Sequence, residues 1–233
     1  MNAIESFLSV SRYWPVLLTV AVYLLAVWLQ KKTKLTILNP ILISALLIIP
    51  VLLLSGTSLE AYTNGTELLS YLLTPATICL GLSLYEQLQT LKNDLPAVLI
   101  GVVAGTVTSL GTVWGLCALF GADRTLLVSM LPKSVTTAIG IALSEEAGGI
   151  VALTAAMIVT TGLFGNLAGG LLCKLLHIED PIARGVAYGT ASHVIGTSRA
   201  VTEGNLTGAV SSLSLAVAGL LTAVLFPVIT SLA

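Results

Sequence analysis

Three cationic side chains lie inside interrupted apolar segments of the sequence. Lys133 stands between Pro132 and Ser134, with an apolar run before it and a glycine-containing segment after it. A lysine inside a membrane costs about 2.5 kcal/mol or more to insert, which makes it a functional candidate. His193 and Arg199 occupy the interruption of a second segment. Since arginine binds carboxylates through a planar fork and histidine takes up a proton near neutral pH, these residue types predict a site for a small carboxylate anion.

Hydroxyl side chains surround these cations in the sequence. The substrate site we predict consists of Lys133, Ser134, Thr136, Thr137, Ser192, His193, Thr197 and Arg199. Thr190 and Ser198 lie beside them. Hydroxyls also cap broken helices and hold membrane helices together, so most of them have a structural explanation as well.

The sequence leaves open two structural alternatives and the identity of the proton carrier. Lys133 could pair with Glu145 or Glu146 to hold the fold, and His193 could be hydrogen-bonded within a helix bundle. For coupling of transport to protons, the candidate carriers are His193, Glu146 and Glu203, with Glu145 as a further carboxylate. His193 is the first choice, because an unperturbed histidine pKa of about 6.5 lets its charge change near neutral pH.

The composition requires a membrane around these groups. The 233 residues include 10 basic and 11 acidic side chains, so that 9% are charged and 56% are hydrophobic, whereas a soluble domain carries about 25% charged residues. Such a chain cannot cover a core with a solvated surface. The sequence therefore predicts an all-α polytopic protein of the cell membrane.

Other functional classes find no support in the sequence. A net charge of −1 shows no basic excess for nucleic acid, and the cysteines at 79, 117 and 173 lack metal-ligand or redox spacing. No P-loop, HExxH or GxSxG motif is present. We expect no enzyme, no cofactor and no metal site.

Apolar runs of suitable length divide the chain. A span needs about 20 apolar residues, and the candidates are 13–29, 37–54, 68–85, 96–120, 150–176 and 206–232. Two further segments, 124–147 and 181–204, are apolar at their ends but carry Pro, Gly, hydroxyls and charges in the middle. They are typical of broken helices, which either cross the membrane or enter and return.

The charges in the loops favour re-entrant hairpins over crossing helices. Eight spans divide the loop lysines and arginines evenly between the two sides. Six spans plus two re-entrant hairpins place Lys31, Lys32, Lys34, Lys92, Lys174 and Arg184 inside, against Arg12 and Arg124 outside. Because cytoplasmic loops carry the basic excess, we prefer six spans with both termini outside.

This topology also predicts how the chain is organised. We expect a single membrane domain over 1–233, with helices of 1–120 serving as scaffold or oligomerisation surface. Within 121–233, each broken segment is followed by a span rich in small residues, and both units carry an Ile-Gly pair and then an acidic residue. In the six-span topology these units enter from opposite faces. They would form an inverted repeat whose hairpin tips meet near the membrane midplane.

Several motifs resemble one known family. PKSVTT (132–137), EEAGGI (145–150), PIARGVAYGTASHVIGTSRA (181–200) and TGAVSSL (207–213) together resemble the LrgB/CidB family of bacterial antiholin-like membrane proteins, which is related to part of the plastid glycolate/glycerate transporter. The resemblance extends from about 38 onward and is densest over 131–213. Ala138, Val151, Ser198 and Thr207 depart from the family pattern, and the first two weaken the expected helix breaks.

The resemblance implies two functions. Family members act on murein hydrolase activity and lysis with a small LrgA/CidA-type membrane partner, or they transport small carboxylates such as pyruvate, glycolate or glycerate. Because a lysis scaffold has no need of cations at membrane depth, we expect a carboxylate transporter. Membrane lipid, a second copy of the chain and the LrgA/CidA-type protein are the expected partners. Regulation of lysis without transport is the alternative.

Overall fold

The chain is helical throughout the residues that its structure, a computed structural model, describes. These are 13–33, 40–72, 75, 78–79, 82, 85 and 92–231. The predicted all-α class is thereby confirmed. The chain divides into two compact units, Met1–Cys79 and Leu80–Ala233.

The first unit contains four described helices. They are α2 (Trp14–Thr33), α3 (Pro40–Ser55), α4 (Leu59–Gly65) and α5 (Glu67–Tyr71). Helix α2 packs on α3 and α4, and the hydroxyls of Thr19 and Tyr62 share a hydrogen bond of 2.6 Å. The polar stretch after α3 forms short helices because Ser58 caps the first of them, accepting from the Ala61 N–H at 3.2 Å.

Not every predicted span can be compared with the structure. The predicted span 13–29 corresponds to α2, whereas α3 has 16 residues and is shorter than a typical span. Eight of the 18 positions of the predicted span 68–85 lie outside the described residues, as do Arg12 and Lys34.

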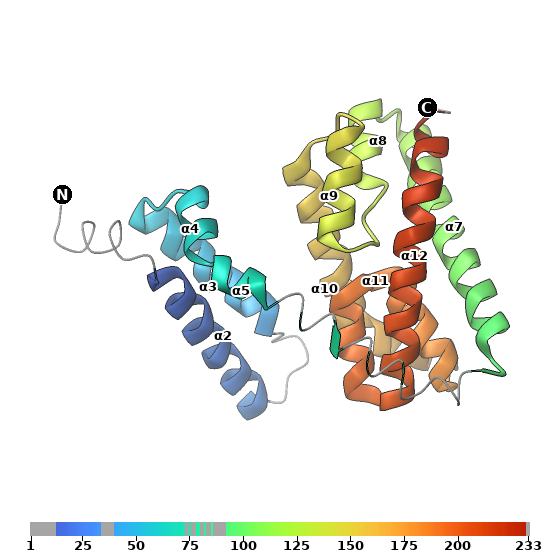
Figure 1. The fold of residues 1–233 in the computed structure, drawn as a ribbon, viewed down its shortest axis with the longest axis horizontal. Coiled ribbons are helices and arrows are strands. Elements are labelled where there is room, and N and C mark those ends of the chain that lie inside the picture. The colour runs from blue at the N-terminus through green and yellow to red at the C-terminus, as the bar shows by residue number, and fades with distance from the viewer. Residues whose placement is uncertain are drawn as a thin grey trace. The chain divides into compact units, whose positions relative to one another are not determined.

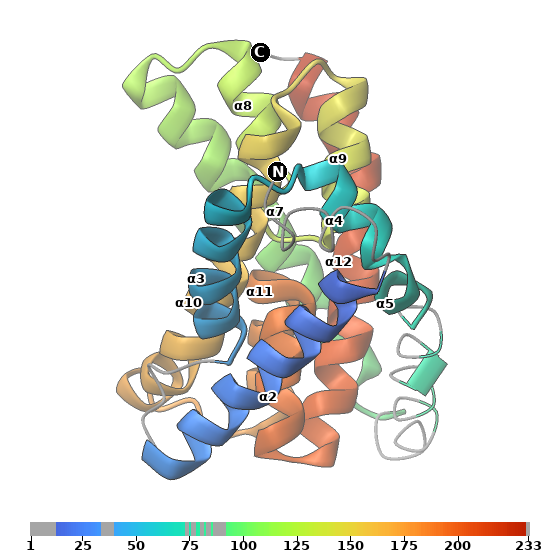
Figure 2. The ribbon, with the colours of Figure 1, turned by 90° about the vertical axis from the view of Figure 1, so that its left-hand side faces the viewer.

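The second unit contains six helices within its described part. They are α7 (Leu95–Phe120), α8 (Arg124–Met130), α9 (Thr137–Glu146), α10 (Val151–Leu175), α11 (Pro181–Glu203) and α12 (Asn205–Ser231). Helices α7, α10 and α12 run the length of the unit, with α8 and α9 at one end and α11 at the other (Figure 1). Figure 2 shows the same arrangement from the side.

Among the described residues, four helices are long and apolar enough to cross a membrane. They are α2, α7, α10 and α12, with 20 to 27 residues each. This finding supports the predicted membrane protein, and it matches four of the six predicted spans. Helix α7, which the sequence analysis grouped with the N-terminal helices, packs against α11 and α12 in the second unit.

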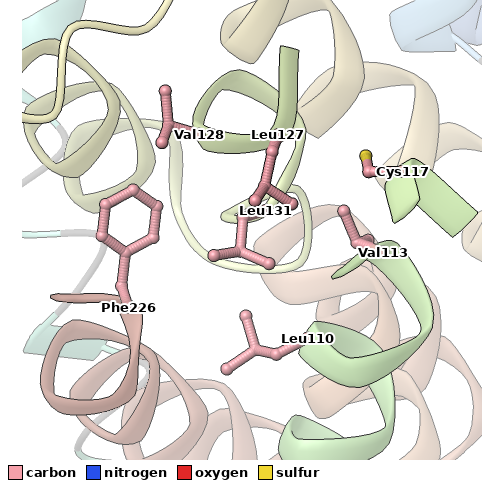
Figure 3. Packing of buried hydrophobic residues seen from close by; sticks show 7 residues of the cluster. All are labelled: Leu110, Val113, Cys117, Leu127, Val128, Leu131 and Phe226. Atoms are coloured by element: carbon pink, nitrogen blue, oxygen red, sulfur yellow. The ribbon is translucent and has the colours of Figure 1, made fainter. Parts of the chain in front are cut away.

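An apolar cluster fixes α8 between α7 and α12. It consists of Leu110, Val113, Cys117, Leu127, Val128, Leu131 and Phe226 (Figure 3). Leu131, at the end of α8, is 1% exposed. Because burial of one such side chain contributes about 1.5–3 kcal/mol, this cluster holds the segment after α8, which carries Lys133, against α7 and α12.

Helices α11 and α12 approach each other closely through glycines. A side chain at Gly185 would meet the Thr207 carbonyl oxygen and Val210, and one at Gly189 would meet the Ser211 backbone and Ser214. Small residues at a helix contact let two backbones approach within the membrane. The first half of α11 is therefore held against α12.

Candidate functional site

Helix α11 is broken at its centre. Ser192 has φ −135° and ψ 17°, and His193 has φ 41° and ψ −139°, so neither residue is helical. A positive φ in a non-glycine residue costs on the order of 1–3 kcal/mol and concentrates at functional sites. The polar centre of 181–204 predicts an interruption at this place.

The two halves of α11 fold back on each other. The Tyr188 hydroxyl donates to Glu203 Oε1 at 2.8 Å although the two residues are 15 positions apart. In a straight helix they would be roughly 22 Å apart. Arg184, still closer to the start of α11, places Nη2 at 3.0 Å from Glu203 Oε2. The segment therefore enters and returns at the same end.

Helices α8 and α9 make a corresponding hairpin. The Ile150 N–H, just after α9, donates to the Ser129 hydroxyl in α8 at 2.7 Å across 21 positions, where a straight helix would separate them by about 31 Å. The turn between the helices carries Lys133. Helix α9 leads directly into the start of α10, and α11 follows the end of α10. The two hairpins consequently enter from opposite ends of α10.

Lys133 is held by hydroxyl groups. Its Nζ donates to the Ser109 hydroxyl at 3.2 Å and to the Ser134 hydroxyl at 3.0 Å, and these two hydroxyls lie 3.1 Å apart. Within the described residues no carboxylate pairs with Lys133. The ion pair that the sequence left open is not formed, since Glu145 and Glu146 are exposed at the far end of α9.

His193 is buried against α10. It is 3% exposed, and its Nε2 lies 2.9 Å from the Ile158 carbonyl oxygen. A carbonyl can only accept, so Nε2 is the donor and carries a proton. The sequence left open that His193 is hydrogen-bonded within the helix bundle, and this hydrogen bond is present. That the other ring nitrogen carries a transported proton stays a prediction.

One face of α10 is shaped to receive the break in α11. A side chain at Gly162 would meet the His193 ring, and one at Gly165 would meet Ser192. Asn166 follows on the same helix and donates its amide to the Ile195 carbonyl at 2.9 Å. A side-chain donor thereby satisfies a carbonyl group beside the helix break.

A cavity of about 350 Å³ lies between α10, α11 and the first hairpin turn. The polar residues in its wall are Lys133, Thr161, Tyr188 and Ser192. Most of the remaining wall is apolar, including Phe164, Leu172 and Ile178. A single ammonium group in a largely apolar wall suits an anion that carries one charge and a small body.

The hairpin turns also meet around a smaller space, of about 10 Å³. Ser109, Ser134 and Thr190 contribute to its wall, together with Thr106, whose hydroxyl has no hydrogen-bond partner in the described part of the chain. A space of this size is near the minimum that holds one water molecule. Residues of both hairpins therefore face the same small space.

Several predicted site residues lie at the turns but make structural contacts. Thr197 donates to the His193 carbonyl at 2.9 Å and shares a bond of 2.8 Å with Ser211. Thr136 begins α9 without a side-chain cap, and Thr137 is exposed. Their binding of substrate stays a prediction.

Arg199 lies in an ion pair and does not line the 350 Å³ cavity. Its Nε is 3.2 Å from Glu203 Oε1, and Glu203 also holds Arg184 and Tyr188. Of the proton-carrier candidates, Glu203 is thus bound by two arginines, whereas Glu146 is exposed. The structure does not bring Arg199 and Lys133 together on one cavity wall.

Two contributors to the site were absent from the predicted set. Ser109 is a hydroxyl within an apolar span, and nothing in the sequence distinguishes it from Thr106 or Thr108. Tyr188 follows the PIARG segment, and its partner Glu203 is 15 positions away in sequence. The pairing of Arg199 with Glu203 can be predicted from the sequence, because the spacing i,i+4 brings two helical side chains together.

The fold and site define a membrane protein in which two folded-back helices place a lysine and a histidine inside a helix bundle. The chain belongs to the LrgB-like family, whose profile matches residues 19–232. This confirms the resemblance and the assignment to the membrane.

Curated relatives cover nearly the whole chain. The holin-like protein CidB of Staphylococcus epidermidis is 35% identical over 214 residues, covering 92% of this chain and 93% of the relative. CidB of Staphylococcus aureus is 36% identical over 214 residues, with the same coverage of 92% and 93%. The antiholin-like protein LrgB of Bacillus subtilis is 31% identical over 225 residues, covering 96% and 97%. No solved structure matches the chain.

Proposed function

We propose that this protein acts in a holin/antiholin-like membrane system that controls murein hydrolase activity and cell lysis. The observation that carries the proposal is the similarity over 92% of the chain to the holin-like protein CidB. The relative from Bacillus subtilis is named antiholin-like. A small membrane protein of the LrgA/CidA type is the proposed partner, and a second copy of the chain is a further one.

A second candidate function is transport of a small carboxylate of the pyruvate, glycolate or glycerate type. Lys133 favours it, because its ammonium group lies on the wall of a cavity of about 350 Å³ and its partners among the described residues are hydroxyls. A charge in an apolar surrounding is stabilised by an opposite charge. A monocarboxylate would supply that charge while Ser109 and Ser134 orient the lysine.

We infer that the two folded-back segments form an inverted repeat with the helices that follow them. Helices α8 and α9 followed by α10 would be one unit, and α11 followed by α12 the other. Their entry from opposite ends of α10 and the shared space between Ser134 and Thr190 support this inference. In such repeats the substrate lies near the membrane midplane, where the turns meet.

The two functions are compatible. If the protein lets carboxylate anions cross the membrane, the flux alters the ionic state on both sides and can change the activity of murein hydrolases. Lys133 then serves both functions. Lysis control without transport requires no role for Lys133 beyond folding.

The test compares uptake and lysis for the same variants. Proteoliposomes with the purified protein, with and without the LrgA/CidA-type partner, receive labelled pyruvate or glycolate. Loss of a hydrogen bond to a charged group costs about 1.5–3 kcal/mol, so uptake by Lys133→Gln should fall at least about tenfold. The matched control is Lys92→Gln, since Lys92 is exposed outside any described helix.

Lysis is then measured in cells that lack the gene and carry each variant. If lysis control depends on anion flux, Lys133→Gln loses both activities and Lys92→Gln keeps both. If Lys133→Gln restores lysis control without uptake, the protein regulates lysis by another route. A wild-type protein that neither changes lysis nor moves anions contradicts both functions.

A further inference from the structure

A second pocket lies where α10 ends and α11 begins. It has a volume of about 290 Å³ and is lined by Cys173, Lys174, His177, Ile178, Glu179 and Arg184. Cys173 and Ile178 also contribute to the cavity around Lys133, so they form a wall between the two spaces. The chain turns sharply here, with His177 at φ 55°.

Two cations in this pocket retain unused donors. Lys174 forms no ion pair within the described part of the chain. Arg184 uses Nη2 for Glu203, but its Nε is buried and has no hydrogen-bond partner among the described residues. A buried donor without an acceptor costs about 1–3 kcal/mol. An anionic oxygen in the pocket would satisfy it.

The surface beside the pocket is apolar and exposed. At the end of α10 and just after it, Leu171, Leu175 and Leu176 are each at least 60% exposed. In a helix long enough to cross a membrane, such side chains face acyl chains. The charged residues of the pocket follow immediately along the chain, as expected where a span reaches the headgroup layer.

We propose that this pocket binds the phosphate of a phospholipid headgroup. The Lys174 ammonium and the Arg184 ε N–H donate to the phosphate oxygens, and the acyl chains lie on the exposed leucines of α10. Glu179 in the wall repels a second negative charge, which favours a phosphodiester with one charge over a free multivalent anion. Basic pockets at the ends of membrane helices bind lipid headgroups by this chemistry. The site is separate from the function proposed above.

The experiment measures lipid binding to the purified full chain in detergent by native mass spectrometry. The probes are phosphatidylglycerol, a diacylglycerol with the same acyl chains, and inorganic phosphate. Wild-type protein should retain phosphatidylglycerol in preference to diacylglycerol. One Lys or Arg near a membrane surface contributes enough attraction to an anionic lipid that Lys174→Gln should bind about fivefold more weakly.

Matched variants separate binding from folding. Lys92→Gln removes an exposed lysine elsewhere and should bind phosphatidylglycerol as the wild type does. Arg184→Lys keeps a cation for Glu203 but lacks the ε N–H, so it should weaken lipid binding with little change in the unfolding temperature. Equal retention of phosphatidylglycerol by Lys174→Gln and wild type would overturn the proposal. Equal affinity for diacylglycerol or for inorganic phosphate would do so as well.

Discussion

Single residues differ in how far the sequence defines their roles. Lys133 was selected because a lysine within an apolar segment is costly, and the structure gives it hydroxyl partners without a carboxylate. Arg199 is a candidate because its planar fork suits a carboxylate, but Glu203 lies one helical turn away and pairs with it. A charged side chain in an apolar segment is costly, and so indicates a functional site, only where no opposite charge pairs with it. Partners at i,i+4 can be read from the sequence, whereas those brought in by folding, such as Ser109, cannot.

At the residue scale we predict that Glu203 stabilises the fold. Glu203→Gln leaves Arg184 and Arg199 without their carboxylate and weakens the bond from the Tyr188 hydroxyl. Loss of one partner from such a network costs about 1–3 kcal/mol. The measurement is thermal unfolding of the protein in detergent.

Glu146→Gln is the matched control for this prediction. Glu146 is exposed at the end of α9 and forms no ion pair in the described structure. Its variant should unfold at the wild-type temperature. Equal stability of the two variants would remove the structural role assigned to Glu203.

Helices and hairpins were predictable to different degrees. The long apolar helices α7, α10 and α12 follow directly from the length of their apolar runs. The break in α11 was expected from its polar centre, although its position at Ser192 and His193 depends on contacts with α10 that the sequence does not show. The short helix α4 was not predicted, because a stretch rich in Thr, Ser and Gly is equally typical of a loop, whereas α5 overlaps the start of the predicted span 68–85.

At the element scale we predict that Gly165 is required for α10 to receive the broken helix. A side chain at this position would collide with Ser192. Gly165→Ala should therefore destabilise the protein by about 1–3 kcal/mol. Gly111→Ala in α7 is the control, since nothing lies within 4 Å of its added carbon, and it should be neutral or stabilising by up to about 1 kcal/mol. Unfolding temperatures measured side by side decide the comparison, and equal values would contradict the packing argument.

A second prediction at this scale concerns the two hairpins. Because each segment returns to its own end, residues flanking one hairpin should be reached from the same side of the membrane. Single cysteines at Ala122 and Ala147, in a background without the native cysteines, should react with an impermeant reagent from one side. Cysteines at Ile178 and Asn205 should react from the other.

The control for this labelling is permeabilised membranes, in which all four cysteines should react. Reaction of Ala122 and Ala147 from opposite sides would show that α8 and α9 cross the membrane. The six-span topology and the midplane site would then both fail.

At the scale of the whole molecule, the grouping of the helices cannot be predicted from composition. A low charge content requires a membrane, but it does not determine how the helices group. The two compact units divide near residue 79, so that α7 belongs with the hairpins through contacts with α11 and α12. Such grouping depends on complementary surfaces, including the glycines of α11 against α12. The spacing of apolar residues does not predict this grouping of helices, since membrane helices are apolar on most faces.

The last prediction, at this scale, is that anion uptake by the whole protein carries protons and that His193 moves them. Glu146 is exposed and Glu203 is held by two arginines, whereas His193 is buried at the break in α11. Histidine changes its charge near neutral pH, and a bound anion favours its protonated form. Uptake should therefore rise as external pH falls and should acidify the interior of proteoliposomes.

A pair of histidine variants tests this coupling. Both histidines of the chain have positive φ, 41° at His193 and 55° at His177, and Asn replaces either ring with an uncharged polar side chain that does not titrate near neutral pH. His193→Asn should abolish the acidification that accompanies pyruvate uptake, and His177→Asn should retain it. Acidification that persists in His193→Asn excludes this histidine as the carrier. If the wild-type protein takes up pyruvate without acidification, proton coupling is excluded. The anion then crosses alone, and the membrane potential that it builds up opposes further uptake.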